Sequence, residues 1–390
     1  MHEARPLRLV LMGIAATLAG VGLGRFAYAA LLPGLIESGW LTAQQAGFVG
    51  AANLLGYLLG AISASLVARR LGTAHTLRLS ALLIASSFLA SAWPAPVWWF
   101  SLWRLVAGIT GAFLMVLAPS QVLHNLPAHQ RKRAGTLIFS GIGLGVLLSA
   151  TLVPALLSAG PAATWIALGL VSLPALWLVW PSWPAPPRHA PAATTASHTG
   201  PALVLVYLCY ALDAGGFVPH TVFWVDYLQR QLHMHHWQAA LQWGLFAIGA
   251  VCGPFLIAAL ARQLGWQRTL LSALTVKGLA ILLPVALPSL TSISLSSLLV
   301  GALIPGMVAS TAGRISELVP ASRYPQSWGR ATALFALMQA ISAYAMAALY
   351  PRPHGASLIF WLGGGLLLTG AAIQLLALLG ERRRAQPSTC

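Results

Sequence analysis

Two stretches of this 390-residue chain determine its fold: GYLLGAISASLVARRLG at residues 56–72 and GAVCGPFLIAALARQLG at residues 249–265. Their three glycines, their Ala-Arg pair and their closing Leu-Gly pair all coincide at a separation of 193 residues. Gly108 and Gly301 lie at the same separation. A shared offset across two apolar pairs, with a charged loop included, indicates an internal repeat. We therefore expect two halves built from similar helices.

The composition places these helices in a membrane. Hydrophobic residues make up 58% of the chain and charged residues only 7%, with six acidic residues in all, whereas a soluble domain carries about 25% charged residues. A spanning helix needs about 20 apolar residues, and long runs such as 202–212 do not alternate as β-barrel strands do. The apolar runs predict twelve helices, near residues 7–36, 43–67, 76–92, 97–121, 134–157, 162–181, 201–225, 238–260, 269–287, 292–313, 328–349 and 356–379.

The basic residues are distributed asymmetrically over the predicted loops. If the N-terminus is cytoplasmic, 17 of the 22 Lys and Arg residues fall in inside segments, and only Arg230 and Arg352 fall outside. This positive-inside bias is typical of a polytopic membrane protein. It accounts for the net charge of +16 without a nucleic-acid partner, because a nucleic-acid binder gathers its arginines on one soluble face. We expect a bacterial inner-membrane protein with both termini in the cytoplasm.

One stretch between the halves has the composition of a linker. Residues 182–200 are rich in Pro, Ala, Thr and Ser, and such a segment cannot pack a core. The predicted organisation is an N-terminal six-helix bundle at residues 1–181, a cytoplasmic linker at 182–200, and a C-terminal six-helix bundle with a short basic tail at 201–390. A monomer is expected.

Four motifs in the first half form a recognisable set: Gly-Leu-Gly-Arg-Phe-Ala-Tyr at residues 22–28, Gln-Ala-Gly at 45–47, Ala-Asn-Leu-Leu-Gly at 52–56 and the glycine-rich run 139–145. With them the chain resembles the YbfB/YjiJ-like branch of the major facilitator superfamily, over most of its length and most densely in the first half. The resemblance implies two six-helix bundles around a central cavity lined by helices 1, 4, 7 and 10. The loop after the second helix departs from the superfamily pattern, because Ala68 stands where an Asp is usual.

Two arginines inside the helices are candidate solute ligands. A charge at the bilayer centre costs about 2.5–3.5 kcal/mol on insertion scales, so such a residue usually faces a cavity. Arg25 lies within the motif of the first helix and is expected to bind an anion or a coupling ion, with a structural arginine as the alternative. Arg104 of the fourth helix could join it, because the guanidinium fork suits a carboxylate; bundle packing is the alternative. The resemblance adds Tyr28 and Asn53 to the solute-binding residues.

Asp213 is the only acidic residue deep in a predicted helix, which makes it the candidate proton-coupling group. Burial and a nearby cation act in opposite directions on such a carboxyl, so it could bind and release a proton. The alternative is a fixed countercharge for Arg25 or Arg104. His220, two helical turns further on, is expected on the same face and is assigned to solute binding and to proton coupling. Lys277 of the ninth helix is expected to be structural or to snorkel.

No metal, cofactor or nucleotide site is predicted. The outer-loop tract at residues 233–236 contains three histidines, but their spacing defines no ligand set, so metal transport is a minor alternative. No phosphate-binding loop with a Gly-Lys-Ser/Thr ending is present, which argues against ATP-driven transport by this chain. Scattered acidic residues argue against a membrane enzyme, and the short loops argue against a sensor with a soluble effector domain.

The predicted function is secondary active transport. We expect the protein to move a small organic solute, which could be an anion, by alternating access, with a proton gradient as the energy source. The lipid bilayer, the solute and a proton are the expected partners. A facilitator or exporter of the same fold without proton coupling is the first alternative, and an integral-membrane enzyme is a weaker one.

Overall fold

The computed structural model describes residues 4–180, 183, 200–320 and 323–385. Within these ranges the chain is helical and forms no β strand, and twelve helices are long and apolar enough to cross a membrane. The predicted fold class, an all-α membrane protein with twelve spanning helices, is therefore confirmed. Apart from Trp183 and Gly200, the predicted linker at 182–200 lies outside the described residues.

Each half contains six spans, and in each half the first span is interrupted. The N-terminal half comprises α1 (Ala4–Thr17), the π-helical turn η1 (Leu18–Leu23), α2 (Ala27–Glu37), α3 (Ala43–Leu71), α4 (Thr73–Ala90), α5 (Val97–His124), α6 (Ala128–Leu157) and α7 (Pro161–Val179). The C-terminal half comprises α8 (Pro201–Gly216), η2 (Pro219–Phe223), α9 (Trp224–Asp226), η3 (Tyr227–Gln231), α10 (His236–Leu264), α11 (Trp266–Ala286), α12 (Leu290–Leu318), α13 (Tyr324–Leu349) and α14 (Gly355–Ala385).

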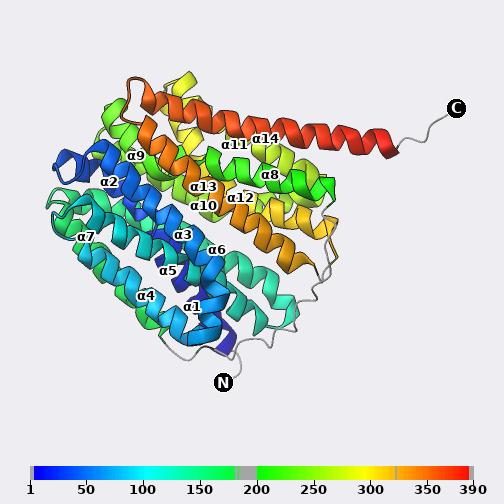
Figure 1. The fold of residues 1–390 in the computed structure, drawn as a ribbon, viewed down its shortest axis with the longest axis horizontal. Coiled ribbons are helices and arrows are strands. Elements are labelled where there is room, and N and C mark those ends of the chain that lie inside the picture. Colours follow the sequence, from blue (N-terminus) through cyan, green and yellow to red (C-terminus); the bar gives the residue numbers. More distant parts are fainter. Residues whose placement is uncertain (1–3, 181–182, 184–199, 321–322, 386–390) are drawn as a thin grey trace.

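The two halves lie side by side, the first drawn from blue to teal and the second from green to red (Figure 1). They meet where α3 packs against α13, where α6 packs against α10, and where α2 packs against α9 and η2. The end of the molecule that carries Glu37 and the loop before α10 is called the outer end below. At the opposite end, α14 extends beyond its neighbours (Figure 1).

The internal repeat is visible in the packing of small residues. A Cβ on Gly56 of α3 would meet the carbonyl oxygen of Leu105 in α5, and a Cβ on Gly249 of α10 would meet that of Leu298 in α12. Both partners in the second contact lie 193 residues after those in the first. The same offset relates two further pairs of contacts: Gly60 with Ile109 and Gly253 with Ala302, and Gly108 with Asn53 and Gly301 with Phe246. Small residues thus allow α3 and α5, and likewise α10 and α12, to approach closely.

The ends of α3 and α10 are encoded locally. Thr42 caps α3 by accepting from the backbone of Gln45 while the Gln45 side chain accepts from the backbone of Thr42, which satisfies two free N–H groups of the first turn. Gly72 and Gly265 end these helices with φ angles of +83° and +76°. Only glycine adopts such angles without strain, so both repeats stop at the same place.

The outer surface of the helices suits a lipid environment. Trp177, Leu241 and Leu376 are at least 69% exposed, and many other large apolar side chains on the bundle surface are exposed as well. A soluble monomer rarely shows contiguous apolar area of this extent. Acyl chains are therefore the medium in which these faces are stable.

Candidate functional site

The first span is interrupted at the position of Arg25. Residues 24–26 form a turn between η1 and α2, where the sequence alone predicted one continuous helix over 7–36. The glycines of this segment allow η1 to lie close to α6, because a Cβ on Gly22 would meet Gly145 of α6. Irregular backbone at membrane depth is tolerated only where other protein groups satisfy it, and such groups are present here.

Two side chains from other helices hold the carbonyl oxygen of Gly24 at this turn. The Nδ2 of Asn53 in α3 donates to it at 3.4 Å, and the Nη1 of Arg104 in α5 donates to it at 3.1 Å. The same Asn53 nitrogen also donates to the backbone carbonyl of Arg104 at 3.0 Å. The turn in the first span is therefore fastened to α3 and to α5.

Two nitrogens of the Arg104 guanidinium hydrogen-bond to the protein. Its Nη2 donates to the Ser87 hydroxyl at 3.0 Å, and its guanidinium carbon lies 5.2 Å from the ring centre of Phe88 and 5.1 Å from that of Trp165. The residue has no exposed surface. Of its three nitrogens only Nε has no hydrogen-bond partner.

Arg25 occupies a different environment from Arg104. Its guanidinium carbon lies 5.3 Å from the ring centre of Phe26 and 5.9 Å from that of Tyr57. Its Nε and Nη2 are both buried and have no hydrogen-bond partner. The residue as a whole is half-buried. Two donors of one guanidinium are thus shielded from solvent without an acceptor.

Tyr28 and Asn53 complete the candidate residues of the N-terminal half. The Tyr28 hydroxyl donates to the carbonyl of Ala46 at 2.8 Å, which joins α2 to α3. The Oδ1 of Asn53 is buried without a partner. Asn53 and Arg104 therefore hold the turn that carries Arg25, while Tyr28 links α2 to α3, so that three of these four side chains hydrogen-bond to the protein itself.

The seventh span is interrupted at the matching position. Phe217 is a turn residue between α8 and the π-helical run that follows, and it lies 193 residues after Gly24. The prediction of one regular helix over 201–225 was therefore wrong in this detail. Interrupted helices at corresponding positions of two repeats are the best pointer to the binding site of a transporter.

Asp213 pairs with Lys277 rather than with either arginine. The Nζ of Lys277 in α11 lies 2.6 Å from the Oδ1 of Asp213 in α8, and the exposed fractions of the two side chains are 0% and 1%. Lys277 Nζ also lies 4.2 Å from the ring centre of Phe217. Lys277 therefore does not snorkel to the membrane surface. The second carboxylate oxygen, Oδ2, is buried without a partner.

His220 does not share a regular helix face with Asp213, because the interruption at Phe217 lies between them. Its Nε2 lies 2.8 Å from the Ser296 hydroxyl of α12, and its ring stacks on Trp224 with the centres 4.3 Å apart. Its Nδ1 is buried without a partner. The assignment of these candidate residues to solute or proton binding stays a prediction.

A buried cluster at the outer end was not predicted from the sequence. The Tyr350 hydroxyl donates to the Oδ2 of Asp226 at 2.5 Å, and Arg230 lies 3.0 Å from the Oδ1 of Asp226. The Phe223 ring stacks on Tyr350 with the centres 4.5 Å apart. Burial, with the Asp226 charge as a further cause, raises the pKa of Tyr350 well above its usual value, so the phenol is a donor at neutral pH. The Asp226 carboxylate at the end of an apolar run was the available signal.

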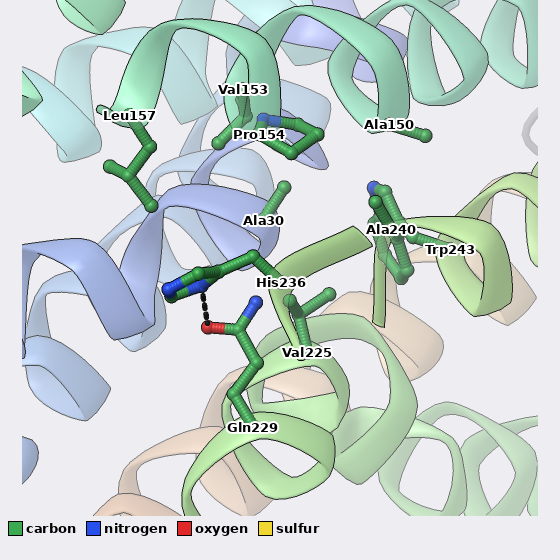
Figure 2. A pocket seen from close by; sticks show the side chains of 10 residues that line it. All are labelled: Ala30, Ala150, Val153, Pro154, Leu157, Val225, Gln229, His236, Ala240 and Trp243. Atoms are coloured by element: carbon green, nitrogen blue, oxygen red, sulfur yellow. Dashed lines mark hydrogen bonds between the residues drawn. The ribbon is translucent and has the colours of Figure 1, made fainter. Parts of the chain in front are cut away.

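A small pocket with a cavity volume of about 10 Å³ lies between the halves near the outer end, and Figure 2 shows its lining. Most of its lining is apolar, and its polar rim consists of His236 and Gln229, which hydrogen-bond at 3.2 Å. The lining residues are Ala30, Ala150, Val153, Pro154, Leu157, Val225, Gln229, His236, Ala240 and Trp243. Of the nearby histidines, His235 caps α10 by accepting from the backbone of Trp237. Among the described residues no three His, Cys, Asp or Glu side chains form a metal-binding group.

Twelve spans in two repeats, with interrupted helices at matching positions, define a membrane transporter of the major facilitator type. The comparison with protein families agrees with this class. A family described as "Uncharacterised MFS-type transporter YbfB" matches residues 17–375. The chain belongs to this family, and the resemblance inferred from the motifs is confirmed.

Individual proteins also resemble the chain. A "Glucose transport protein" from Synechocystis sp. is 39% identical over 98 residues, which are 24% of this chain and 21% of that protein. Among solved structures, a D-xylose-proton symporter superimposes with a TM-score of 0.77 at 16% identity, covering 95% of this chain and 97% of the other. A bacterial homologue of the human lysosomal transporter Spinster, in an inward-facing and occupied conformation, gives a TM-score of 0.75 at 14% identity, covering 96% of each chain. These structural likenesses show the fold.

Proposed function

We propose that this protein is a secondary active transporter that moves a small organic solute by alternating access and couples the movement to a proton at Asp213. The observation that carries the proposal is the buried ion pair beside the interrupted seventh span. Asp213 is held by Lys277 through one oxygen, while its other oxygen has no partner. A carboxylate with a free oxygen at membrane depth has an unused site for a proton.

The position of the Asp213–Lys277 pair links protonation of Asp213 to the conformation of the turn at Phe217. The Asp213 carbonyl accepts from the backbone N–H of Phe217 at 3.2 Å, and Lys277 lies against the Phe217 ring. Protonation of Asp213 neutralises the carboxylate and weakens its hold on Lys277, because a charge-assisted hydrogen bond is roughly twice as strong as a neutral one. The turn at Phe217 is thereby free to adopt a second arrangement.

The contacts between the halves support a state that is closed at the outer end. A Cβ on Gly47 of α3 would meet Ala347 of α13 at 2.9 Å, and a Cβ on Gly50 would meet Val222 of η2 at 3.0 Å. We propose that this end faces the periplasm and that both termini are cytoplasmic, in a bacterial inner membrane. Reporters fused after His198 and Arg384 should then report cytoplasm and a fusion at His235 the outside; a periplasmic C-terminus would contradict the orientation.

The names of similar proteins favour solute transport without fixing the solute. A symporter of a sugar and a proton shares the fold, and a glucose transport protein is 39% identical over a region that covers 24% of this chain. We propose that the protein acts as a monomer and leaves its solute chemically unchanged. A solute recovered intact from loaded vesicles checks the second point, and light scattering of the purified protein checks the first.

The substitution Asp213→Asn distinguishes proton coupling from solute movement. Purified protein is first screened for carboxylates, sugars, amino acids and drug-like cations that raise its melting temperature, since ligands stabilise the folded state that binds them. The best compound is then used in vesicles. Asp213→Asn should retain solute exchange and lose accumulation driven by a pH gradient.

The matched control is Glu37→Gln, which neutralises an exposed carboxylate at the outer end and should leave both activities unchanged. A folded Asp213→Asn variant with wild-type accumulation would remove Asp213 from the mechanism, and solute exchange without accumulation in the wild type would favour a facilitator of the same fold. Absence of any solute movement by the wild type would reject the transporter itself.

A further inference from the structure

The guanidinium of Arg25 has one edge that the protein leaves empty. Its unpartnered nitrogens are Nε and Nη2, which lie along one edge of the planar guanidinium and point one N–H each in parallel directions. This edge matches the two oxygens of a carboxylate and forms two hydrogen bonds with them. Two buried donors without an acceptor are unfavourable, so the arrangement is suited to an acceptor that arrives from outside.

No described acidic side chain neutralises Arg25. Three of the four acidic side chains described by the structure pair with other cations: Asp213 with Lys277, Asp226 with Arg230, and Glu317 with Arg314. The fourth, Glu37, is exposed at the outer end. An uncompensated cation at membrane depth is costly. An anionic solute would remove this cost on binding.

Arg104 cannot provide a second anion-binding edge. Its Nη1 and Nη2 are occupied by Gly24 and Ser87, and its guanidinium lies between the rings of Phe88 and Trp165. Only Nε remains without a partner. The two arginines are therefore not two halves of one site, and a single negative charge is accommodated.

Arg104 instead fixes the position of Arg25. It holds the carbonyl of Gly24, the residue directly before Arg25, and Asn53 holds the same oxygen. Loss of this contact would let the turn move and would change the direction in which Arg25 projects. Arg104 is a positioning residue in this arrangement.

The surroundings of Arg25 are aromatic. Phe26 and Tyr57 lie beside the guanidinium, and the Phe26 ring centre lies 6.2 Å from that of Trp243 and 6.1 Å from that of Phe246 in α10. Aromatic surfaces bury an apolar ligand body favourably.

We infer that Arg25 binds the carboxylate of an organic monoanion with an apolar or aromatic body through Nε and Nη2, and that Arg104 positions it through Gly24. The inference rests on the proposed transport function, whose solute class it specifies. It predicts that binding depends on the carboxylate group itself.

Matched pairs of a carboxylate and its amide test the inference on purified full-length protein. The probes are 3-phenylpropionate, benzoate and hexanoate, each compared with its amide, and phenylsuccinate as a dianion; affinities are measured by calorimetry. The wild type should bind at least one carboxylate about tenfold or more tightly than its amide, as expected for a hydrogen bond to a charged group. The dianion should bind more weakly than the monoanion.

The variants separate the roles of the two arginines. Arg25→Gln should abolish the preference for the carboxylate, and Arg25→Lys, which keeps the charge but loses the fork, should reduce it. Arg104→Gln should reduce the preference in the wild-type background and have no further effect on it in Arg25→Gln. A merely structural role for Arg104 would lower carboxylate and amide affinities equally and leave their ratio unchanged. Arg352→Gln, at an exposed outer residue, is the control and should retain the preference.

Each contrary result would reject one specific part of the inference. Equal binding of carboxylates and amides by the wild type, binding of none of these carboxylates, or an undiminished preference in folded Arg25→Gln would reject the carboxylate site. An unchanged ratio in Arg104→Gln would reject the positioning role. Because these measurements require no transport, carboxylate binding without solute movement would reject the transport proposal alone.

Discussion

Asp213 and Lys277 form a salt bridge of 2.6 Å between α8 and α11 in which neither side chain is more than 1% exposed. Buried charges are stable only when they are paired. The bond therefore joins two spans of the C-terminal half and places a titratable carboxylate next to the turn at Phe217. It also gives Lys277 a defined partner inside the bundle.

Removal of one charge of the Asp213–Lys277 pair should destabilise the protein more than removal of both charges. Lys277→Met leaves the Asp213 carboxylate buried without a countercharge, which typically costs about 3–5 kcal/mol. The double variant Asp213→Asn/Lys277→Met removes both charges and should recover much of the loss. Melting temperatures of the two single variants and the double variant in detergent measure the coupling. Strictly additive effects would contradict a direct interaction between the side chains.

The repeated glycine contacts should be intolerant of a methyl group in both halves. In Gly56→Ala and Gly249→Ala the new Cβ meets a backbone carbonyl of the neighbouring helix, and overpacking of this kind costs about 1–3 kcal/mol.

Gly244→Ala, on the same helix as Gly249, is the matched control for these substitutions. Nothing lies within 4 Å of its added Cβ, so it should be neutral or stabilise by about 0.4–1 kcal/mol. Thermal unfolding of the three variants checks the contrast, and equal destabilisation at all three positions would refute it.

The Tyr350–Asp226 hydrogen bond should help to keep the outer end closed. Tyr350→Phe removes the donor while the ring can still stack on Phe223, so the tie between α13 and the seventh span is weakened. A cysteine placed at Val222 in a cysteine-free background should then react faster with a membrane-impermeant thiol reagent. Tyr344→Phe, at a ring whose centre lies 6.0 Å from that of Phe48, serves as the control and should leave the rate unchanged.

The same hydrogen bond should be insensitive to pH over the neutral range. The pKa of Tyr350 is raised above its ordinary value of 10.0 in the folded protein. The contribution of its proton to stability is therefore fully present below pH 10 and is lost only as the pH rises through the raised pKa. The difference in melting temperature between wild type and Tyr350→Phe should stay constant from about pH 6 to about pH 9, both below that ordinary pKa. A difference that falls steeply within this interval would contradict the assignment.

Transport of one monocarboxylate with one proton should be electrically neutral. The two charges cancel, so a pH gradient should drive uptake whereas a membrane potential alone should not. Vesicles with a potassium diffusion potential set by valinomycin, with equal pH on both sides, provide the measurement. Uptake driven by that potential would show that the ratio of charges differs from one to one.

Much of the architecture could be predicted because the internal repeat appears in the sequence as residues of the same type at a constant separation. The constant offset between Gly56 and Gly249 reflects a contact that occurs twice, on Leu105 and on Leu298. The long apolar runs then gave the spans, and the motif around Arg25 gave the family. These features depend on local composition and on spacing, which the sequence states directly.

The interruptions and the ion pair could not be predicted in the same way. Helical periodicity placed Asp213 and His220 on one face only under the assumption of a regular helix, and the turn at Phe217 breaks that assumption. Lys277 is 64 residues from Asp213, and the apolar sequence around Lys277 does not indicate which residue it pairs with. Such a contact follows from how α8 and α11 pack, which is a property of the whole bundle.

The two interruptions differ in how their carbonyl groups are satisfied. The Gly24 carbonyl is held by Asn53 and Arg104 from two neighbouring helices, whereas the Phe217 carbonyl accepts from His220 and Thr221 of its own span. The residues that match Asn53 and Arg104 at the repeat offset are Phe246 and Ser297; Phe246 has an apolar side chain, and the Ser297 hydroxyl bonds to Trp224 and Gln242 rather than to Phe217. The turn of the first span is thus anchored to two other helices through the Gly24 carbonyl, whereas the Phe217 carbonyl can move without breaking a hydrogen bond to another helix. A protein with twofold internal symmetry would on this basis move asymmetrically, with the C-terminal half as its mobile element.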